Sequence, residues 1–364
     1  MNVYLERAQK EGTPLIDGEK VTYVWWGTPI PALIDDVDNW ESNPVELAQV
    51  DHDTWIHEQQ LPLNTYLEYA YLDLERGERT QDPFNRRRTP NGYGDYNHYF
   101  YMPKAAPNKL TRRSPNTPRG DVTRHTIPTL RLAAGRERRV DLYQPPTNHP
   151  APLIVVYDGD DFLSRGHLTT IVDNLISEER IQPVCLAMVA NGKEARELEY
   201  GCNEITIGFL TECVLPLAYD NLNLLDIDQH PGAFGIIGAS MGGLMAFFTG
   251  LRLPQIFGHV LSQSGAFSID IHEFIIFDLV RHMPMPELNL WLDVGTFEWL
   301  LETNRDMHNL LAVQGMPHGY FEFPGGHNFT SWRNHIWRGL EYLFGSAQSN
   351  KCHPTAGHQN AFGS

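Results

Sequence analysis

The sequence predicts a small β-sandwich followed by a larger α/β domain whose sheet is mostly parallel. Up to about Pro103, runs rich in aromatic and β-branched residues are separated by Asn, Asp, Gly and Pro, and no helical pattern of any length is visible. From Leu153 to Phe344, unbroken apolar runs alternate with helix-like patterns, which is typical of parallel strands covered by helices on both faces. The length of 364 residues agrees with two domains.

In the first domain, the clearest strands are expected at 21–26 and 66–71. The connection after them alternates Pro, Asn, Lys and Arg without periodicity, which indicates a linker. The expected boundaries are 1–104 for the β-sandwich, 105–119 for the linker, 120–346 for the α/β domain and 347–364 for a disordered tail.

The second domain alternates two kinds of pattern along its length. Strands are expected at 129–132, 139–143, 153–157, 184–189, 234–237, 259–262, 288–294 and 318–323, and helices at 168–176, 203–217 and 242–251.

Between the predicted strand 234–237 and the predicted helix 242–251 stands Gly238-Ala239-Ser240-Met241-Gly242. Gly-x-Ser-x-Gly in this setting is the nucleophile elbow of α/β-hydrolases, a turn so tight that its neighbours need almost no side chain. We therefore expect an α/β-hydrolase fold with Ser240 as the nucleophile. The N–H of Met241 would point at the oxyanion that forms during attack.

A serine hydroxyl needs a base, and the base needs an orienting acid; in this fold they follow in the order serine, acid, histidine. His327 comes after the last predicted strand, behind two glycines, and holds the position of the base. Glu298, beyond a Gly-Thr turn, is the preferred acid. Asp293, inside the preceding strand, remains the alternative acid.

The loop Asp158-Gly159-Asp160-Asp161 follows an earlier central strand and should supply the second oxyanion donor, from the N–H of Gly159 or Asp160. Its three acids also permit a divalent-metal site. We disfavour that interpretation, because serine chemistry needs no metal and the ligand set is incomplete. No metal and no cofactor are expected.

The net charge of −17 and the pI near 5.3 argue against nucleic-acid binding. From Arg76 to Arg139, however, 15 Lys or Arg stand against 5 Asp or Glu. A solvated connector is the preferred interpretation of this basic window, and a surface for an anionic ligand is the alternative.

The four cysteines, Cys185, Cys202, Cys213 and Cys352, form no CxxC pair, which favours buried thiols over disulfides or zinc ligands. No apolar signal or membrane-length segment is visible. We expect a cytoplasmic protein without a membrane partner, and a homodimer stays open.

Several short motifs together resemble the enterochelin (ferric enterobactin) esterase family. They are Tyr157-Asp158-Gly159, Arg196-Glu197-Leu198, the elbow through Gly243, Ser262-Gln263-Ser264-Gly265-Ala266-Phe267, Gly295-Thr296-Phe297-Glu298, and Gly325-Gly326-His327-Asn328-Phe329 with Trp332-Arg333. The resemblance implies a serine nucleophile at Ser240, a base at His327 and an acid at Glu298.

The N-terminal half is similar, more weakly, to the β-sandwich of that family, which lies over the catalytic mouth. By this resemblance Trp25, Trp26, Trp40 and Trp55 would line a cleft, although aromatic core is the preferred interpretation for most of them. Siderophore esterases bind a strongly anionic iron complex, which calls for converging cations. This chain is acidic overall, and Arg86, Arg87 and Arg88 are its candidate cations for that purpose.

The sequence therefore predicts a two-domain serine esterase acting on a small-molecule ester. Its substrate is a siderophore trilactone by resemblance, with Trp40 and the three arginines as candidate contacts. A carbohydrate-acyl esterase, of feruloyl or acetyl type, is the first alternative. A non-catalytic binding protein on the same scaffold is the second, and acyl transfer to an acceptor other than water also stays open.

Overall fold

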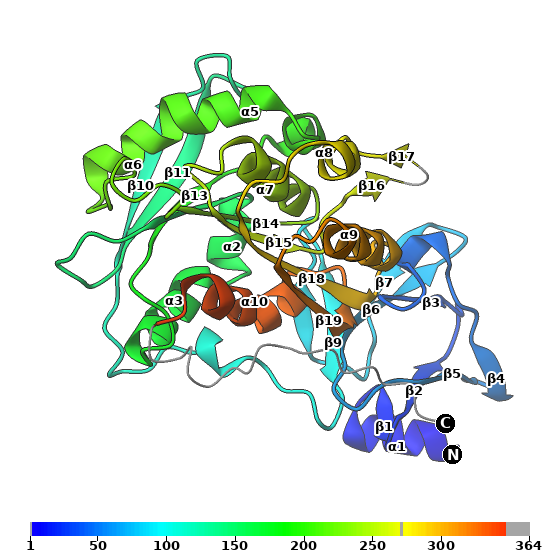
Figure 1. Ribbon diagram of the computed structural model, residues 1–364. Coiled ribbons are helices and arrows are strands. Elements are labelled where there is room, and N and C mark those ends of the chain that lie inside the picture. The colour runs from blue at the N-terminus through cyan, green and yellow to red at the C-terminus, as the bar shows by residue number, and fades with distance from the viewer. Residues whose placement is uncertain (1, 270–271, 347–364) are drawn as a thin grey trace, which may run out of the picture. The chain divides into compact units, whose positions relative to one another are not determined.

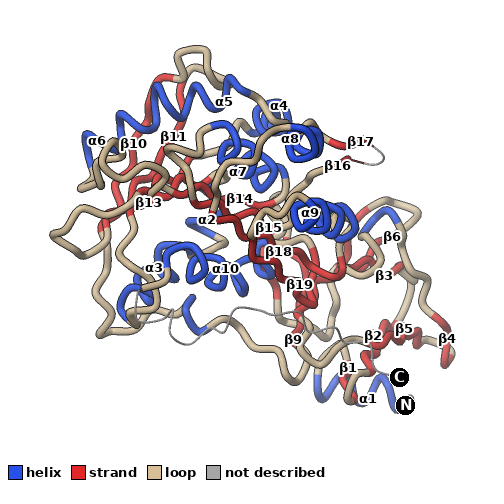
Figure 2. The backbone as a smooth tube through the Cα atoms, in the orientation of Figure 1, coloured by secondary structure: helices blue, strands red, loops and turns tan. Residues whose placement is uncertain are grey.

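The computed structural model describes residues 2–269 and 272–346 (Figures 1 and 2). The predicted disordered tail and Cys352 lie outside these residues. The described chain forms two compact units. The first contains residues up to 107 together with two later segments, 294–302 and 322–331, and the second contains the rest. We describe each unit by itself.

The first unit contains two antiparallel sheets. One has the order β1 (Leu15–Asp17), β2 (Lys20–Trp26), β5 (Thr54–Gln60) and β4 (Ala48–Asp51). The other has the order β3 (Ala32–Asp35), β6 (Tyr66–Asp73), β9 (Tyr96–Tyr101) and β8 (Arg88–Pro90), with β7 (Glu78–Thr80) paired to β6. The two strands expected here, 21–26 and 66–71, are confirmed as β2 and β6.

Aromatic side chains from both sheets form the core of this unit. Tyr23 of β2 lies edge-on to Tyr69 of β6, with ring centroids 5.0 Å apart, and Phe100 of β9 belongs to the same cluster. All three are fully buried. Because residues from two different sheets fill one core, the predicted β-sandwich is confirmed.

The prediction that this part lacks a helix is wrong. Helix α1 spans Val3–Glu11, and the Asn2 side chain caps it by accepting the N–H of Tyr4 at 2.9 Å. Its buried face consists of Leu5 and Ala8 alone. Only two of its nine residues are both apolar and buried, which is too few to produce a recognisable helical period in the sequence.

The second sheet has eight strands in the order β10-β11-β13-β12-β14-β15-β18-β19. Their bounds are β10 Asp121–Pro128, β11 Glu137–Gln144, β12 Leu153–Val156, β13 Cys185–Val189, β14 Gly235–Ala239, β15 His259–Gln263, β18 Asn289–Phe297 and β19 His318–Gly326. The pairs from β13 to β18 are parallel, and β10 and β11 add an antiparallel edge. The expected, mostly parallel sheet is confirmed.

The strand expected at 129–132 is instead a turn between β10 and β11. Leu130 and Arg131 have φ values of 52° and 66°, a left-handed conformation that no strand contains. The N–H of Leu132 closes the turn on the carbonyl of Thr129 at 2.8 Å. Alternating apolar residues suggested a strand here, but the pairing of the hairpin ends at Pro128.

Helices cover both faces of this sheet (Figure 1). A Cβ at Gly250 of α7 (Met241–Arg252) would meet Val260, and one at Gly339 of α10 (Phe329–Phe344) would meet Leu261. Val260 and Leu261 are adjacent in β15, so their side chains point to opposite faces. Helices α7 and α10 therefore lie on opposite sides.

The other helices connect the strands. They are α2 (Gly159–Ser164), α3 (Leu168–Ser177), α4 (Arg196–Tyr200), α5 (Glu204–Phe209), α6 (Leu215–Asn221), α8 (Ile276–His282) and α9 (Leu301–Val313), with a π-helical turn at Leu210–Val214, 3₁₀ turns at Trp40–Ser42, Lys109–Thr111 and Lys193–Ala195, and the short pair β16 (Ser268–Ile269) and β17 (His272–Glu273). The helix expected at 203–217 is thus α5, the π turn and the start of α6.

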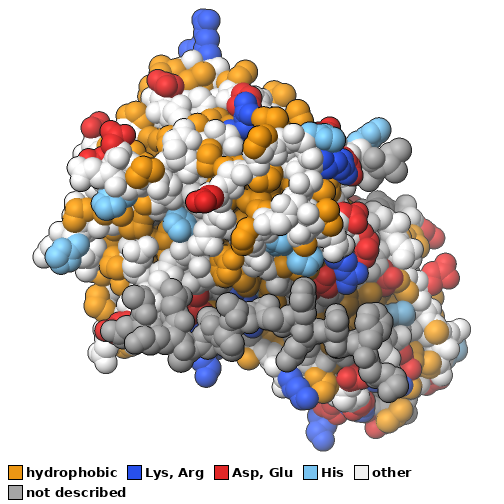
Figure 3. All heavy atoms as spheres, in the orientation of Figure 1, with side chains coloured by type: hydrophobic (Ala, Val, Ile, Leu, Met, Phe, Trp, Pro, Cys, Tyr) orange, Lys and Arg blue, Asp and Glu red, His pale blue; other side chains and the backbone are white. Residues whose placement is uncertain are grey.

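Charged side chains of both signs are interspersed with hydrophobic ones on the face drawn in Figure 3. Cys185 and Cys213 are buried and Cys202 is half-buried, and all three thiols are free. Among the described residues, no helix is both long and apolar enough to cross a bilayer.

Candidate active site

Ser240 lies between β14 and α7 in a backbone conformation that few residues with a side chain adopt. Its φ is 59° and its ψ is −127°, a strained combination for any residue other than glycine. A Cβ at Gly238 would overlap the carbonyl group of Gly242, so the turn needs glycine there. This is the geometry of the predicted elbow.

Backbone hydrogen bonds fix Ser240 from several sides. Its N–H donates to the carbonyl of Gln263 at 2.9 Å, and its own carbonyl accepts the N–H groups of Leu244 at 3.0 Å and Ala266 at 3.1 Å. Met241 is the first residue of α7. Helix geometry gives the N–H of such a residue no partner within its own helix, which leaves it for another acceptor.

The loop after β12 is the second predicted source of oxyanion donors. Asp158 has a left-handed φ of 52°, and Gly159 and Asp160 then begin α2, so their N–H groups belong to its first turn. A Cβ at Gly159 would overlap the backbone of Met188 in the neighbouring strand, which requires glycine. Asp160 is held by an ion pair with Arg139.

Asp158 connects this loop to the elbow through Arg196. The Nε and Nη2 atoms of Arg196 each donate to one oxygen of the Asp158 carboxylate at 2.7 Å. Nη2 also approaches the carbonyl of Ala239, next to the serine, at 3.4 Å. The sequence did not predict this pair, because 38 residues separate its members and no local pattern joins them.

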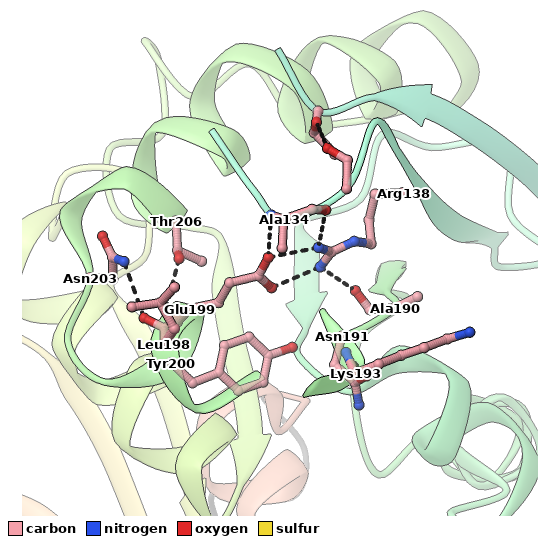
Figure 4. Close-up of polar contacts among 12 residues, drawn as sticks. Ala134, Arg138, Ala190, Asn191, Lys193, Leu198, Glu199, Tyr200, Asn203 and Thr206 are labelled. Carbon is pink, nitrogen blue, oxygen red and sulfur yellow. Dashed lines mark hydrogen bonds and ion pairs between the residues drawn. The ribbon is translucent and has the colours of Figure 1, made fainter. Parts of the chain in front are cut away.

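A buried ion pair anchors the segment that carries Arg196 (Figure 4). Arg138 and Glu199 form two hydrogen bonds, of 2.9 and 2.7 Å, and both side chains are almost fully buried. Arg138 also donates to the carbonyl of Ala190 at 3.0 Å. The next residue, Asn191, donates to Asp158 at 2.8 Å. The segment is therefore fixed at Asn191 and at Glu199, and Arg196 between them contacts Asp158.

The acids that suggested a metal site have cationic partners. Asp158 binds Arg196, Asp160 binds Arg139, and Asp161 lies 3.2 Å from Arg165. Within residues 2–269 and 272–346, no group of three or more His, Cys, Asp or Glu side chains is arranged to hold a metal ion.

His327 and Glu298 are in direct contact. Nδ1 of His327 lies within hydrogen-bond distance of Oε2 of Glu298, and Oε1 of Glu298 accepts the N–H of Gly295 at 2.5 Å. The Glu298 side chain is 0% exposed and that of His327 is 13% exposed. Both carboxylate oxygens thus have a partner, which holds the imidazole in one orientation.

The alternative acid, Asp293, has different partners. It is fully buried, and its carboxylate accepts Nε2 of Gln263 at 3.1 and 3.3 Å and Nε1 of Trp291 at 3.0 Å. The contact between Glu298 and His327 therefore favours Glu298 as the orienting acid.

Trp299 forms one side of the imidazole environment, and the sequence did not single it out. Its ring centroid lies 4.5 Å from that of His327, yet 57% of the residue is exposed. An apolar surface of this size beside the imidazole offers a contact for a flat, apolar group.

The candidate substrate contacts lie in the first unit. Trp40 donates its indole N–H to Asp36 at 3.2 Å, and Arg79 lies over its ring at 5.0 Å. Arg86, Arg87 and Arg88 are exposed. Their contact with a substrate stays a prediction.

Three of the four tryptophans that were candidates for a cleft belong to the packing of the first unit. Trp55 is 6% exposed, and Trp25 and Trp40 pack against buried clusters. Trp26, at 53% exposure, is the exception. The preferred interpretation, aromatic core, therefore holds for Trp55, while Trp25 and Trp40 are partly buried against the core.

The strand order of the large sheet and the strained serine between β14 and α7 define an α/β-hydrolase. The chain belongs to the esterase family whose model, described as "Putative esterase", matches residues 132–343. This is a family of carboxylic ester hydrolases, and the resemblance to enterochelin esterases is confirmed.

Named relatives support the same assignment. The chain is 27% identical to the iron(III) enterobactin esterase of Dickeya dadantii over 72% of its own length and 64% of that protein. It is 24% identical to the iron(III) salmochelin esterase of Escherichia coli O6:H1 over 62% of its own length and 59% of that protein. The chain thus spans about three fifths of the length of these curated relatives.

Solved structures share the fold. The ferric enterobactin esterase of Salmonella typhimurium matches with a TM-score of 0.76 at 22% identity, covering 89% of this chain and 93% of that one. A ferulic acid esterase of Anaeromyces mucronatus matches with a TM-score of 0.55 at 18% identity, covering 66% of this chain and 96% of that one.

Proposed function

We propose that this protein is a serine esterase with Ser240 as nucleophile, His327 as general base and Glu298 as the acid that orients it. The observation that carries the proposal is the left-handed φ of Ser240, 59°, at the junction of β14 and α7. A strained serine in this turn presents its hydroxyl above the sheet, where an ester can reach it. The His327–Glu298 contact supplies the remaining two groups.

In the proposed reaction, Ser240 Oγ bonds to the ester carbonyl carbon while its proton passes to Nε2 of His327. The N–H groups of Met241 and of Gly159 or Asp160 stabilise the oxyanion. The carbon–oxygen bond to the leaving alcohol then breaks, and His327 returns the proton to that alcohol. Water, activated in the same way, releases the acid and restores Ser240.

For the substrate we propose a siderophore-type ester, because the named relatives are iron(III) enterobactin and salmochelin esterases. A carbohydrate-acyl ester is the second candidate, favoured by the ferulic acid esterases among the structural neighbours. Comparing turnover of catecholate trilactones with that of feruloylated and acetylated glycans distinguishes the two. An acyl product on an added alcohol would reveal transfer to an acceptor other than water.

Replacing the nucleophile tests the chemistry. Ser240→Ala should lose hydrolysis of a p-nitrophenyl ester and labelling by a fluorophosphonate, since no other group of the proposed triad can form the acyl-enzyme. Ser177→Ala, which changes an exposed serine at the end of α3, is the control and should keep both. Unreduced turnover in the first variant would refute the assignment. Failure of the probe to label the unmodified protein would support a non-catalytic binding protein.

A further inference from the structure

The loop that carries His327 is held from the N-terminal part of the chain by one buried carboxylate, Asp36, which directly follows β3. Asp36 is 3% exposed. Its two oxygens lie 3.4 and 3.2 Å from Nδ2 of Asn328, the residue after His327. Asp36, His327 and Asn328 all belong to the first compact unit.

Asp36 contacts the two sequence neighbours of His327, Gly326 and Asn328. After His327 it accepts the amide of Asn328. Before His327 it packs so closely against Gly326 that a Cβ there would overlap the carboxylate. Because both neighbours of His327 contact one rigid side chain, the backbone position of the histidine follows that of Asp36.

Asn328 passes this constraint on to helix α10. It is 7% exposed, and its Oδ1 accepts the N–H of Ser331 at 2.8 Å. Asn328 immediately precedes the first residue of α10, so this bond is the side-chain cap of the helix. The amide nitrogen of Asn328 thus donates to Asp36, and its amide oxygen accepts from α10.

Asp36 is itself fixed by donors other than Asn328. The backbone N–H of Glu68 donates to it at 2.8 Å, and Nε1 of Trp40 donates at 3.2 Å. Burial and the nearby Glu68 raise the pKa of Asp36 well above its usual range.

The residue next to Glu298 also packs against the N-terminal β-structure. Phe297, the residue before Glu298, packs against the buried cluster that contains Tyr23 and Tyr69. Both members of the acid–base pair therefore have a sequence neighbour in contact with the N-terminal β-structure.

We propose that Asp36 is a positioning residue for His327, acting through Asn328. The role of the N-terminal β-domain is then to set the orientation of the base. The inference rests on the proposed function, because it assumes that the imidazole is the base. Asp36 touches no reacting atom in this scheme, and its effect falls on the rate of the chemical step.

Variants at both ends of the contact test the inference. Asp36→Ala and Asn328→Ala should each lower kcat for a p-nitrophenyl ester by about 10- to 100-fold with KM within about twofold, as a small displacement of a catalytic group does. In the double variant the two losses should be less than additive, because both substitutions remove the Asp36–Asn328 contact. Asp36→Asn, which keeps an oxygen that accepts from Asn328, should retain most of the activity.

Asp35→Ala is the matched control. Asp35 is the preceding residue and is equally buried, but its carboxylate faces Gln59 at 3.1 Å, Tyr23 at 3.4 Å and the N–H groups of Val37 and Asp38. Its loss should lower thermal stability and leave kcat within about twofold. If the Asp36 variant unfolds, Asn328→Ser decides the matter, because serine keeps a side-chain oxygen that can cap α10 and loses the amide that donates to Asp36.

A proton NMR spectrum separates this inference from the proposed function. The proton between His327 and Glu298 should give a low-field resonance that is sharp in the unmodified protein and in Asp35→Ala, and broadened or lost in Asp36→Ala and Asn328→Ala. Equal kcat in all variants together with an unchanged resonance would overturn the positioning role and leave the esterase proposal standing. A protein without turnover or labelling would overturn the esterase proposal. The resonance would still test whether the Asp36–Asn328 contact orients His327.

Discussion

At the scale of single residues, Glu298 is the side chain whose replacement distinguishes the two candidate acids. One of its oxygens contacts His327 and the other accepts the N–H of Gly295. Glu298→Gln should lower kcat by about 10²- to 10⁴-fold, because an amide in this place no longer favours the productive tautomer of the imidazole. Ester hydrolysis under saturating substrate measures the effect.

Glu302→Gln is the control for that variant, since Glu302 is an exposed acid in the first turn of α9. It should hydrolyse esters at the unmodified rate. If Glu298→Gln were fully active while Asp293→Asn was not, Asp293 would be the orienting acid. If both were active, the enzyme would work with a Ser–His pair alone.

The residues predicted from sequence are those with a local signature. Ser240 stands in a five-residue motif, and His327 follows two glycines after a strand, so the sequence alone marked both as candidates. Choosing between Glu298 and Asp293 required knowing which carboxylate reaches the imidazole. The contacts of Asp36 with Asn328 and of Arg196 with Asp158 were not predicted, because the partners lie 292 and 38 residues apart and no local pattern joins them.

At the scale of elements, the turn between β14 and α7 depends on the absence of a side chain at Gly238. Gly238→Ala should lower the free energy of unfolding by about 1–3 kcal/mol, because the added methyl group overlaps the carbonyl of Gly242. Turnover should fall with it, since relief of the overlap displaces Ser240. Urea unfolding and ester hydrolysis measure the two effects.

Gly208→Ala is the opposite case and serves as the control. Gly208 lies in α5, and its added Cβ would meet only Leu132, at an ordinary 3.6 Å. Replacing a helical glycine should raise the free energy of unfolding by about 0.5–1 kcal/mol and leave turnover unchanged. If both variants behaved alike, the closeness of the turn would not explain the glycine at 238.

The elements that the sequence predicted best are the buried strands. The apolar run 153–157 became β12 and the run 184–189 became β13, because a strand buried on both faces is apolar throughout. Helix α1 and the turn at 129–132 were mispredicted. In both cases a few apolar residues carried too little periodicity to separate helix, strand and turn.

At the scale of the whole molecule, the sequence indicated two domains but not how the chain is shared between them. The segments 294–302 and 322–331, which contain Glu298 and His327, form one compact unit with the N-terminal β-structure. Ser240 belongs to the other unit. This grouping of late segments with the N-terminal part depends on contacts between residues hundreds of positions apart, which no local pattern encodes.

The net charge of −17 makes a further prediction for the entire chain. A strongly acidic protein repels an anionic substrate at long range, and salt screens that repulsion over a Debye length of about 10 Å at 0.1 M. Between low and high NaCl, kcat/KM for an anionic aryl ester should therefore rise relative to that for a neutral ester of similar size. The neutral ester controls for direct effects of salt on the enzyme.

A fall for the anionic ester would mean that a local basic surface outweighs the net charge. Repeating the series with Arg86, Arg87 and Arg88 changed to Gln would then test whether these exposed arginines form that surface, because the fall should disappear with them.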